Sequence, residues 1–548
     1  MRKTPLAALA LLGLAAAAAA QPGTRTPGDA AAAGFTADAF RAHVEFLADD
    51  RLEGREAGSR GYDIGALYVA TRFSALGLTP AANGSWYQQV PLVQFGLTDA
   101  PARLTIGGRS FRHGEDVLLR QSPEAGRLTL EAPVVFAGYG ISDPALGIDD
   151  YAGLDVRGKI VAVLNGSPSD LPSDVGAHLN AAKRAMADRA GAVGMVILRG
   201  REEGRRVAWS RVVGHGTPPG LTWAAEDGTP YSDAPGLRFV ATLGSDAAEA
   251  LFRGAPRPLA RVLAEGARPG ARPAGFALAQ TIRVERESAN RSFTSPNVVA
   301  VLPGSDPALA GEYVLMMAHL DGLGMEPHGA GSAAINNGAM DNATGVATLL
   351  EVARQMAASG QRPRRSILFA AVTAEEKGLR GAHYLARNPV VDGRVVGVVN
   401  LDMPILTYDF QDVIAFGAEH STMAEAVARA GARMGVRLSP DPLPHEGLFT
   451  RSDHYMFVQE GVPAVFLMTG FAGEGERRFT EFLANQYHTP ADDLRLPFNW
   501  NAGARFAQLN YLIAREIADA SEAPRWYEDS YFGRTFGGDR PRAPRAAR

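Results

Sequence analysis

Seven imidazole and carboxylate side chains occupy five places along the second half of the chain. They are His319, Asp321, Asp341, Glu375, Glu376, Asp402 and His488. The 548-residue chain has no cysteine, so disulfides, thiolate metal ligands and thiol catalysis are all excluded. Any bound metal must therefore use imidazole and carboxylate ligands, which suit zinc or a similar divalent ion.

The number of these groups favours two metal ions. A catalytic zinc usually has three protein ligands and an open fourth position, so two histidines and three carboxylates exceed what one ion needs. A carboxylate shared between ions about 3.5–4 Å apart would give each ion its own set. The adjacent Glu375 and Glu376 could then have different roles, because one can bind metal while the other serves as general base toward a bridging water.

Alternating strands and helices are predicted around these residues. We expect strands at Val298–Leu302, Tyr313–Ala318, Ser366–Val372, Val395–Leu401 and Pro463–Met468, and helices at Thr344–Ala358, Glu375–Ala386, Ser421–Met434 and Ala502–Ile517. This alternation predicts an α/β fold with a mainly parallel central sheet flanked by helices. Most of the five places are strand ends, and these converge on one edge of such a sheet.

Each of these residues also has an ordinary structural explanation. A Glu375–Glu376 pair at the start of a helix compensates the helix dipole, and Asp341 beside Asn342 could be only an N-cap. Only their joint placement at the strand ends favours a metal site.

Composition and charge exclude several classes of function. Hydrophobic residues make up 46% of the chain and charged residues 21%, which are ordinary globular values and exclude general disorder. The net charge of −4 provides no basic field for nucleic acid. Residues 1–20 have a basic start, an apolar core and a small-residue run, which predicts a cleaved signal peptide. The mature protein is then expected in the periplasm or the medium, free of the membrane.

Five short strings containing these residues resemble the co-catalytic di-zinc aminopeptidases, a family that also includes glutamate carboxypeptidase. The strings are Ala318-His319-Leu320-Asp321, Met340-Asp341-Asn342-Ala343-Thr344-Gly345-Val346, Thr373-Ala374-Glu375-Glu376-Lys377-Gly378-Leu379, Asn400-Leu401-Asp402-Met403 and Tyr487-His488-Thr489-Pro490. Ser452-Asp453-His454-Tyr455 and the weaker Glu53-Gly54-Arg55 also look like the family.

The resemblance implies a role for each residue. His319 and Asp402 would be terminal ligands of one zinc, Glu376 and His488 would bind the other, and Asp341 would bridge both.

Four further expectations come from the same resemblance. Glu375 would be the general base, and Asp321 would orient the ring of His319. The peptide bond between Asp341 and Asn342 would be cis. Tyr455 is a candidate donor to the oxyanion.

A second domain is expected between two parts of the first. Residues 128–280 carry short β-rich runs and one helix near Leu179–Ala190, and Val135–Gly140, Val156–Val161 and Gly191–Met195 resemble the protease-associated (PA) domain. The expected organisation is a signal peptide (1–20), a flexible leader (21–34), a peptidase domain in two parts (35–127 and 281–520), the inserted mostly-β domain (128–280) and an Arg/Pro-rich tail (521–548).

Two other motifs are false leads. Gly153–Ile160 nearly matches a P-loop, but Ile160 stands where Ser or Thr should bind magnesium. Ser452, Asp453 and His454 have the residue types of a serine triad, yet three consecutive residues cannot converge as a triad does.

The sequence therefore predicts an exported zinc metallopeptidase, in the first place an aminopeptidase acting on small peptides. A carboxypeptidase or another amidohydrolase on the same site is the main alternative, because pocket residues decide the direction of attack. A metal-free receptor-like protein and a single-zinc glutaminyl cyclase are disfavoured, because the full ligand set and Glu375 are present.

Overall fold

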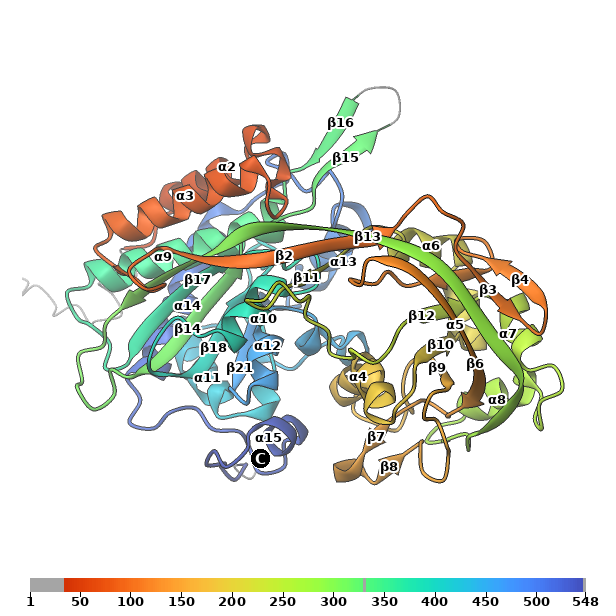
Figure 1. The fold of residues 1–548 in the computed structure, drawn as a ribbon. Helices are drawn as coiled ribbons and strands as arrows, with labels where there is room; N and C mark the ends of the chain where they lie inside the picture. The colour runs from red at the N-terminus through yellow and green to blue at the C-terminus, as the bar shows by residue number, and fades with distance from the viewer. Residues whose placement is uncertain (1–33, 329–331, 546–548) are drawn as a thin grey trace, which may run out of the picture.

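The computed structural model describes residues 34–328 and 332–545, which form a larger and a smaller lobe (Figure 1). The predicted signal peptide and all but the last residue of the predicted leader lie outside the described residues. Within the described ranges, none of the helices combines the length and the apolarity that crossing a bilayer requires.

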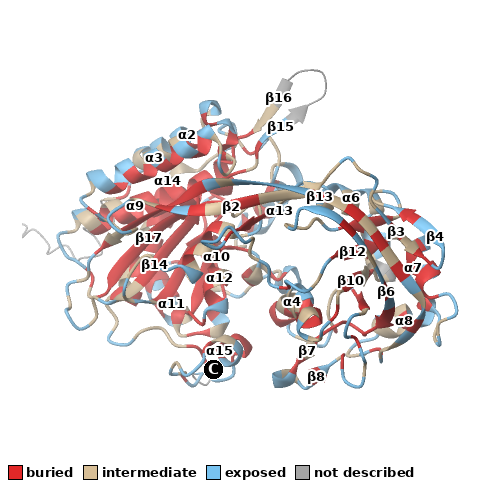
Figure 2. Ribbon diagram, in the orientation of Figure 1, coloured by how far each residue is buried: buried red, intermediate tan, exposed pale blue. Residues whose placement is uncertain are grey.

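The larger lobe contains the mainly parallel sheet that the sequence predicts. Its central strands are parallel neighbours in the order β17 (Ser366–Val372), β14 (Glu312–His319), β18 (Arg394–Leu401) and β21 (Ala464–Thr469). Antiparallel strands flank them, β13 (Phe276–Leu302) beside β17 and β19 (Asp412–Phe416) beside β21. Strands β17 and β21 are buried along their whole length (Figure 2), as expected for a sheet covered on both faces.

Helices cover both faces of this sheet. Helices α9 (Thr344–Ala358) and α14 (Trp500–Ala518) pack against each other and against β14, and α2 (Ala37–Leu47) packs on both helices. Helices α10 (Arg380–Arg387) and α12 (His454–Gln459) pack together, and α12 contacts β18 and β21. Figure 1 shows α10 and α12 in front of the sheet.

Polar caps mark where several helices begin. Thr36 accepts a hydrogen bond from the backbone N–H of Ala39 at the start of α2, and Asn499 accepts one from Ala502 at the start of α14. Each cap satisfies a backbone donor that the first helical turn leaves free.

Helix α10 begins later than the sequence indicated. The expected helix at Glu375–Ala386 starts only at Arg380, because residues 375–379 form a turn in which Gly378 and Leu379 both donate to the carbonyl of Glu375. This turn leaves Glu375 and Glu376 at the end of β17 instead of within a helix.

The smaller lobe has its own parallel strands, β6 (Gly126–Phe136), β9 (Ile160–Leu164), β10 (Gly194–Leu198) and β12 (Val240–Leu243). Its expected helix is present as α4 (Ser173–Arg189) but starts earlier than Leu179. Four further helices were not expected: α5 (Arg201–Arg206), α6 (Trp209–Gly216), α7 (Ser245–Leu251) and α8 (Leu259–Gly266). Helices this short carry too little periodic pattern to be recognised from sequence.

Two long strands connect the lobes. Strand β13 pairs with β2 (Tyr87–Leu97) from Val298 opposite Tyr87 to Ser288 opposite Leu97, and it then continues into the smaller lobe (Figure 1). The C-terminal helix α15 (Tyr531–Phe536) adds a second connection, since the hydroxyl of Tyr531 donates to Asp143 at 2.5 Å. Both lobes are therefore held beside each other by backbone and side-chain contacts.

Candidate metal centre

The structure brings the five expected ligands together in two groups of three. In the first group, Nε2 of His319 lies 3.2 Å from Oδ1 of Asp341 and 3.1 Å from Oδ1 of Asp402. In the second, Nε2 of His488 lies 3.5 Å from Oδ2 of Asp341 and 3.2 Å from Oε2 of Glu376. Asp341 belongs to both groups and offers one oxygen to each.

The ends of the parallel strands position these ligands. His319 ends β14, Asp402 follows β18, and Glu376 lies in the turn after β17. Asp341 lies in the short segment η3 (Ala339–Ala343) that leads into α9, where the backbone of Asp341 and Asn342 is not helical, and the peptide bond from Asp341 to Asn342 is cis, as expected. His488 comes from the loop between α13 (Gly475–Asn485) and α14.

The charges in this cluster are strongly coupled. Burial would raise the pKa of Asp341, but hydrogen bonds from His319 and His488 lower it overall. Burial would lower the pKa of His488, but Asp341 and Glu376 raise it to about 10. The carboxylates of Asp341 and Glu376 therefore favour positive charge at this site, which divalent ions would supply.

Glu375 lies within reach of His319 and Glu376 but is not needed to complete either group. Burial raises the pKa of Glu375 well above the usual value, and Asp402 raises it further against the opposing effect of His319. A carboxyl group that is not required as a ligand and has a raised pKa is suited to accept and return a proton.

Asp321 acts differently from the expectation. The ring of His319 is closest to the backbone carbonyl of Asp321, at 3.1 Å from Nδ1, whereas the carboxylate is 3.9 Å away. The Asp321 carboxylate instead accepts from the backbone N–H groups of Glu375 (3.0 Å) and Glu376 (3.3 Å). Asp321 therefore holds the turn that presents both glutamates.

The structure does not bring Tyr455 to the cluster. Its hydroxyl pairs with Nδ1 of His178 from the smaller lobe at 2.7 Å, and its ring packs against Phe449 and Phe532. The assignment of Tyr455 as oxyanion donor is therefore wrong, because this side chain points toward the lobe interface. Tyr487 lines the pocket instead, stacked on the ring of His488.

Two buried residues support the ligand loops and were not identified as such from sequence. Asp492 accepts from the backbone N–H groups of Met340 (2.7 Å) and Asp341 (2.9 Å). Arg55 donates to the carbonyls of Leu320 (2.9 Å) and Gly338 (3.1 Å). Glu53-Gly54-Arg55 was the only sequence signal for Arg55, and none pointed to Asp492.

Asp402 also has a fixed orientation. The hydroxyl of Ser452 donates to Oδ2 of Asp402 at 2.6 Å, and the side chain of Asn400 donates to the Ser452 oxygen at 2.7 Å. Hydrogen bonds of this kind hold a metal ligand in place and increase the affinity of the site for the metal.

The cluster opens into a pocket of about 260 Å³. Carboxylates and apolar side chains both line it: Asp341, Glu375, Glu376, Asp402, Leu379, Met403, Leu448, Phe466 and Tyr487. Among the described residues that line this pocket, Arg451 carries the one guanidinium group, and no lysine joins it.

The residues present fit a pair of divalent ions. Two ligands at about 2.1 Å from a tetrahedral zinc lie about 3.4 Å apart, close to the separations within each group. The cluster also buries Asp453, whose two carboxylate oxygens have no hydrogen-bond partner in the described part of the chain. Positive charge from metal ions would compensate this concentration of carboxylates.

Comparison with known proteins agrees with this geometry. Residues 297–514 match the model of Peptidase family M28. The chain is 33% identical over 183 residues to leupeptin-inactivating enzyme 1 of Streptomyces exfoliatus (32% of this chain, 36% of that protein). It is 40% identical over 110 residues to a probable zinc metalloprotease of Pyrenophora teres f. teres (strain 0-1) (19% of this chain, 22% of that protein).

The fold extends beyond these local matches. An aminopeptidase from Aneurinibacillus sp. strain AM-1 superposes with a TM-score of 0.52 at 21% identity, covering 90% of this chain and 97% of that one. The chain spans only about a third of the first curated relative and about a fifth of the second. Both ligand groups fall inside residues 297–514, and this part of the chain is a domain of Peptidase family M28.

Proposed function

We propose that the protein is an exported di-zinc metallo-exopeptidase that removes amino-terminal residues from small peptides. One observation carries the proposal: two groups of ligands share Asp341 beside Glu375, at the bottom of an open pocket. His319 and Asp402 would hold one ion, Glu376 and His488 the other, and Asp341 both.

Zinc bound at these positions would polarise the scissile carbonyl and lower the pKa of the attacking water. Glu375 accepts the proton from this water and then delivers it to the leaving amine. Tyr487 lines the same pocket, and its hydroxyl donates a hydrogen bond to the carbonyl oxygen of the scissile bond, which becomes negatively charged during attack. Asp321 keeps Glu375 in place through its backbone hydrogen bonds.

The charge of the pocket supports attack at the amino end. Four carboxylates line it, whereas its one guanidinium, on Arg451, already lies 3.6 Å from Glu446. Asp341, Glu376 and Asp402 would be balanced by the metal ions they bind, so among the described lining residues no unpaired cationic side chain is left to hold the terminal carboxylate of a peptide, as a carboxypeptidase needs. The apolar side chains of Met403, Leu448 and Phe466 favour peptides with an apolar first residue.

The smaller lobe supports a restriction on substrate size. Helix α4 contacts the short helical turns η5 (Pro444–Glu446) and η6 (Leu448–Thr450), and Leu448 is part of the pocket wall. We infer that this lobe acts as a PA-type domain that supports the pocket wall from behind and so limits the size of the substrate. Export rests on the predicted signal peptide at residues 1–20.

The test is mass spectrometry of an unmodified hexapeptide incubated with the mature protein, with and without a chelator. Chelator-sensitive loss of residues from the amino end is expected. Loss from the carboxyl end would keep the metal site but reverse the direction of attack. A peptide that stays intact in zinc-loaded protein would contradict the exopeptidase proposal.

A further inference from the structure

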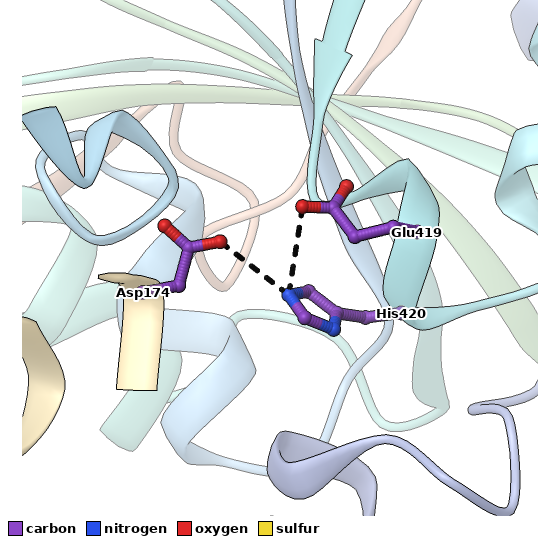
Figure 3. A group of neighbouring side chains, drawn as sticks. All are labelled: Asp174, Glu419 and His420. Carbon is purple, nitrogen blue, oxygen red and sulfur yellow. Dashed lines mark ion pairs between the residues drawn. The ribbon is translucent and has the colours of Figure 1, made fainter. Parts of the chain in front are cut away.

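A second cluster of potential ligands lies between the two lobes, away from the residues assigned to the zinc pair. It consists of Asp174, Glu419 and His420 (Figure 3). Asp174 lies in the first turn of α4 in the smaller lobe. Glu419 and His420 lie in the short turn η4 (Ala418–His420) that follows β19 in the larger lobe.

The spacing in this cluster suits ligands of one ion better than direct hydrogen bonds. Nε2 of His420 is 3.6 Å from Oδ2 of Asp174 and 3.8 Å from Oε1 of Glu419. Both distances exceed the range of an N–H···O hydrogen bond. They are close to the separation of about 3.4 Å between two ligands of a tetrahedral zinc.

Two enclosed atoms of the cluster have no hydrogen-bond partner among the residues that the structure describes. They are Nε2 of His420 and Oδ1 of Asp174, and Asp174 is only 9% exposed. Figure 3 shows Nε2 of His420 pointing between the two carboxylates. Leaving such polar atoms unpaired is costly in a folded protein, so this arrangement itself points to a ligand.

The imidazole ring is held in this direction by its neighbours. The ring of His420 packs against Phe449 at 5.0 Å and against Phe532 at 4.9 Å between centroids. These contacts come from η6 and α15, so two segments distant from each other in the chain fix the ring. A ligand held in one orientation binds metal with a smaller loss of entropy.

The charge around the cluster is negative. Burial raises the pKa of Glu419, and Asp174 and Asp441 raise it further against the effect of His420. Arg545, a group of opposite charge near Glu419, is engaged with Asp529 at 2.8 Å. A bound cation would balance these carboxylates.

We propose that Asp174, Glu419 and His420 form a binding site for one divalent cation of the zinc class that joins the two lobes. One imidazole and two carboxylates are typical zinc ligands, and a water can complete the coordination. The site needs residues from both lobes, so its occupancy depends on the two lobes packing as they do in this structure.

The site lies behind the wall of the catalytic pocket. Phe449, which packs on His420, is the neighbour of Leu448 in the pocket wall. Gly447 lies against Ala177 of α4, where an added Cβ would approach the Ala177 side chain to 3.0 Å. An ion held by Asp174 therefore reduces the motion of the segment 443–452.

The decisive experiment is anomalous diffraction at the zinc edge from crystals of the full mature chain equilibrated with Zn²⁺. A peak between His420 and Asp174, separate from any peak at Asp341, is expected. Its absence at a zinc concentration that saturates the protein in solution would overturn the inference.

Zinc stoichiometry measured by mass spectrometry provides the matched test in solution. Asp174→Asn and His420→Gln should each bind one zinc fewer than the wild type, whereas Asp441→Asn should bind the wild-type number. Equal zinc content in all four proteins would contradict the site. Thermal unfolding of each variant checks that it is folded, and the wild-type diffraction result does not depend on any variant.

Hydrogen exchange measures the effect on the lobes. Adding Zn²⁺ to the wild type should slow exchange in segment 443–452, and the effect should be smaller in Asp174→Asn. These readouts are independent of peptide hydrolysis. A peak at His420 in an inactive protein would reject the peptidase proposal alone, and hydrolysis without that peak would reject the lobe-bridging site alone.

Discussion

Glu375 and Glu376 are neighbours in the chain but have different surroundings. Glu376 pairs with His488 at 3.2 Å as a member of a ligand group, whereas Glu375 is not needed to complete either group that contains Asp341. The same backbone turn presents both, because Asp321 accepts a hydrogen bond from each N–H. Their roles can therefore be separated by single substitutions.

We predict that Glu375→Gln keeps both metal ions and lowers kcat by about 100-fold or more, because the amide cannot accept the proton. Glu376→Ala should instead lose metal, because it removes a ligand. Zinc content and kcat measured on the same samples check both. Glu326→Gln, at an exposed position, is the control. A Glu375→Gln enzyme near the wild-type rate would refute the assignment of the base.

Asp492 provides a second prediction at this scale. It accepts from the backbone at Met340 and Asp341, and burial raises its pKa to about 7 despite these bonds. Asp492→Asn should weaken zinc binding by about 10–100-fold, as the loss of a residue that orients a ligand does. Competition with a chelator measures this affinity. The neighbouring Asp493→Asn should leave the zinc affinity unchanged. A zinc affinity of Asp492→Asn equal to that of the wild type would exclude a positioning role for Asp492.

At the scale of elements, the start of α9 must approach the end of β18 closely. Gly345 lies in the first turn of α9, where an added Cβ would overlap the carbonyl oxygen of Leu401 and Oδ1 of Asn342. The same Asn342 oxygen accepts from the backbone of Met403 at 3.2 Å, so this contact links Asp341 with the segment after Asp402.

We predict that Gly345→Ala lowers the free energy of unfolding by about 1–3 kcal/mol, the usual cost of overpacking, and weakens zinc binding. Urea unfolding and zinc titration measure the two effects. Gly311→Ala, where an added Cβ meets nothing within 4 Å, should behave like the wild type. A stable Gly345→Ala protein with full zinc affinity would show that the helix can shift without cost.

At the scale of the whole molecule, a histidine of the smaller lobe lies at the lobe interface. His178 of α4 pairs with the Tyr455 hydroxyl at 2.7 Å and lies 5.3 Å from the ring of Phe536. Burial lowers the pKa of His178 to about 4, against an opposing effect of Asp143. In the unfolded chain the pKa is about 6.5.

The unfolded state therefore binds more protons between about pH 6.5 and pH 4, so the free energy of unfolding falls as the pH falls through this range. The loss from this group is at most about 3 kcal/mol. Urea unfolding at several pH values should show a steeper loss for the wild type than for His178→Gln. His445→Gln, at an exposed position, should follow the wild type. Parallel curves for the wild type and His178→Gln would contradict this role.

Much of the larger lobe could be predicted because its signals are local. The strand β17 and the helix α9 have the bounds that the residue pattern indicated. Polar residues that follow apolar strands identified His319, Glu376 and Asp402, since the ends of parallel strands meet at one edge. The prediction was less accurate where local pattern is weak, as in the short helices α5–α8.

Long-range contacts explain what could not be predicted at the site. Arg55 reaches the carbonyl of Leu320 across 265 positions, and Asp492 reaches Met340 across 152. Tyr455 was misassigned because its partner His178 comes from the other lobe. No pattern within a short window of sequence contains such pairs.

Residue type and hydrophobic period are local properties, so the chemistry of the ligands and the alternation of strands and helices could be inferred from the sequence alone. The folded chain was needed to show which oxygen of Asp341 faces which histidine, that Tyr487 and not Tyr455 lines the pocket, and that Asp174 meets His420 between the lobes. Those relations depend on how distant segments pack against one another, and packing becomes visible only when the whole chain is folded.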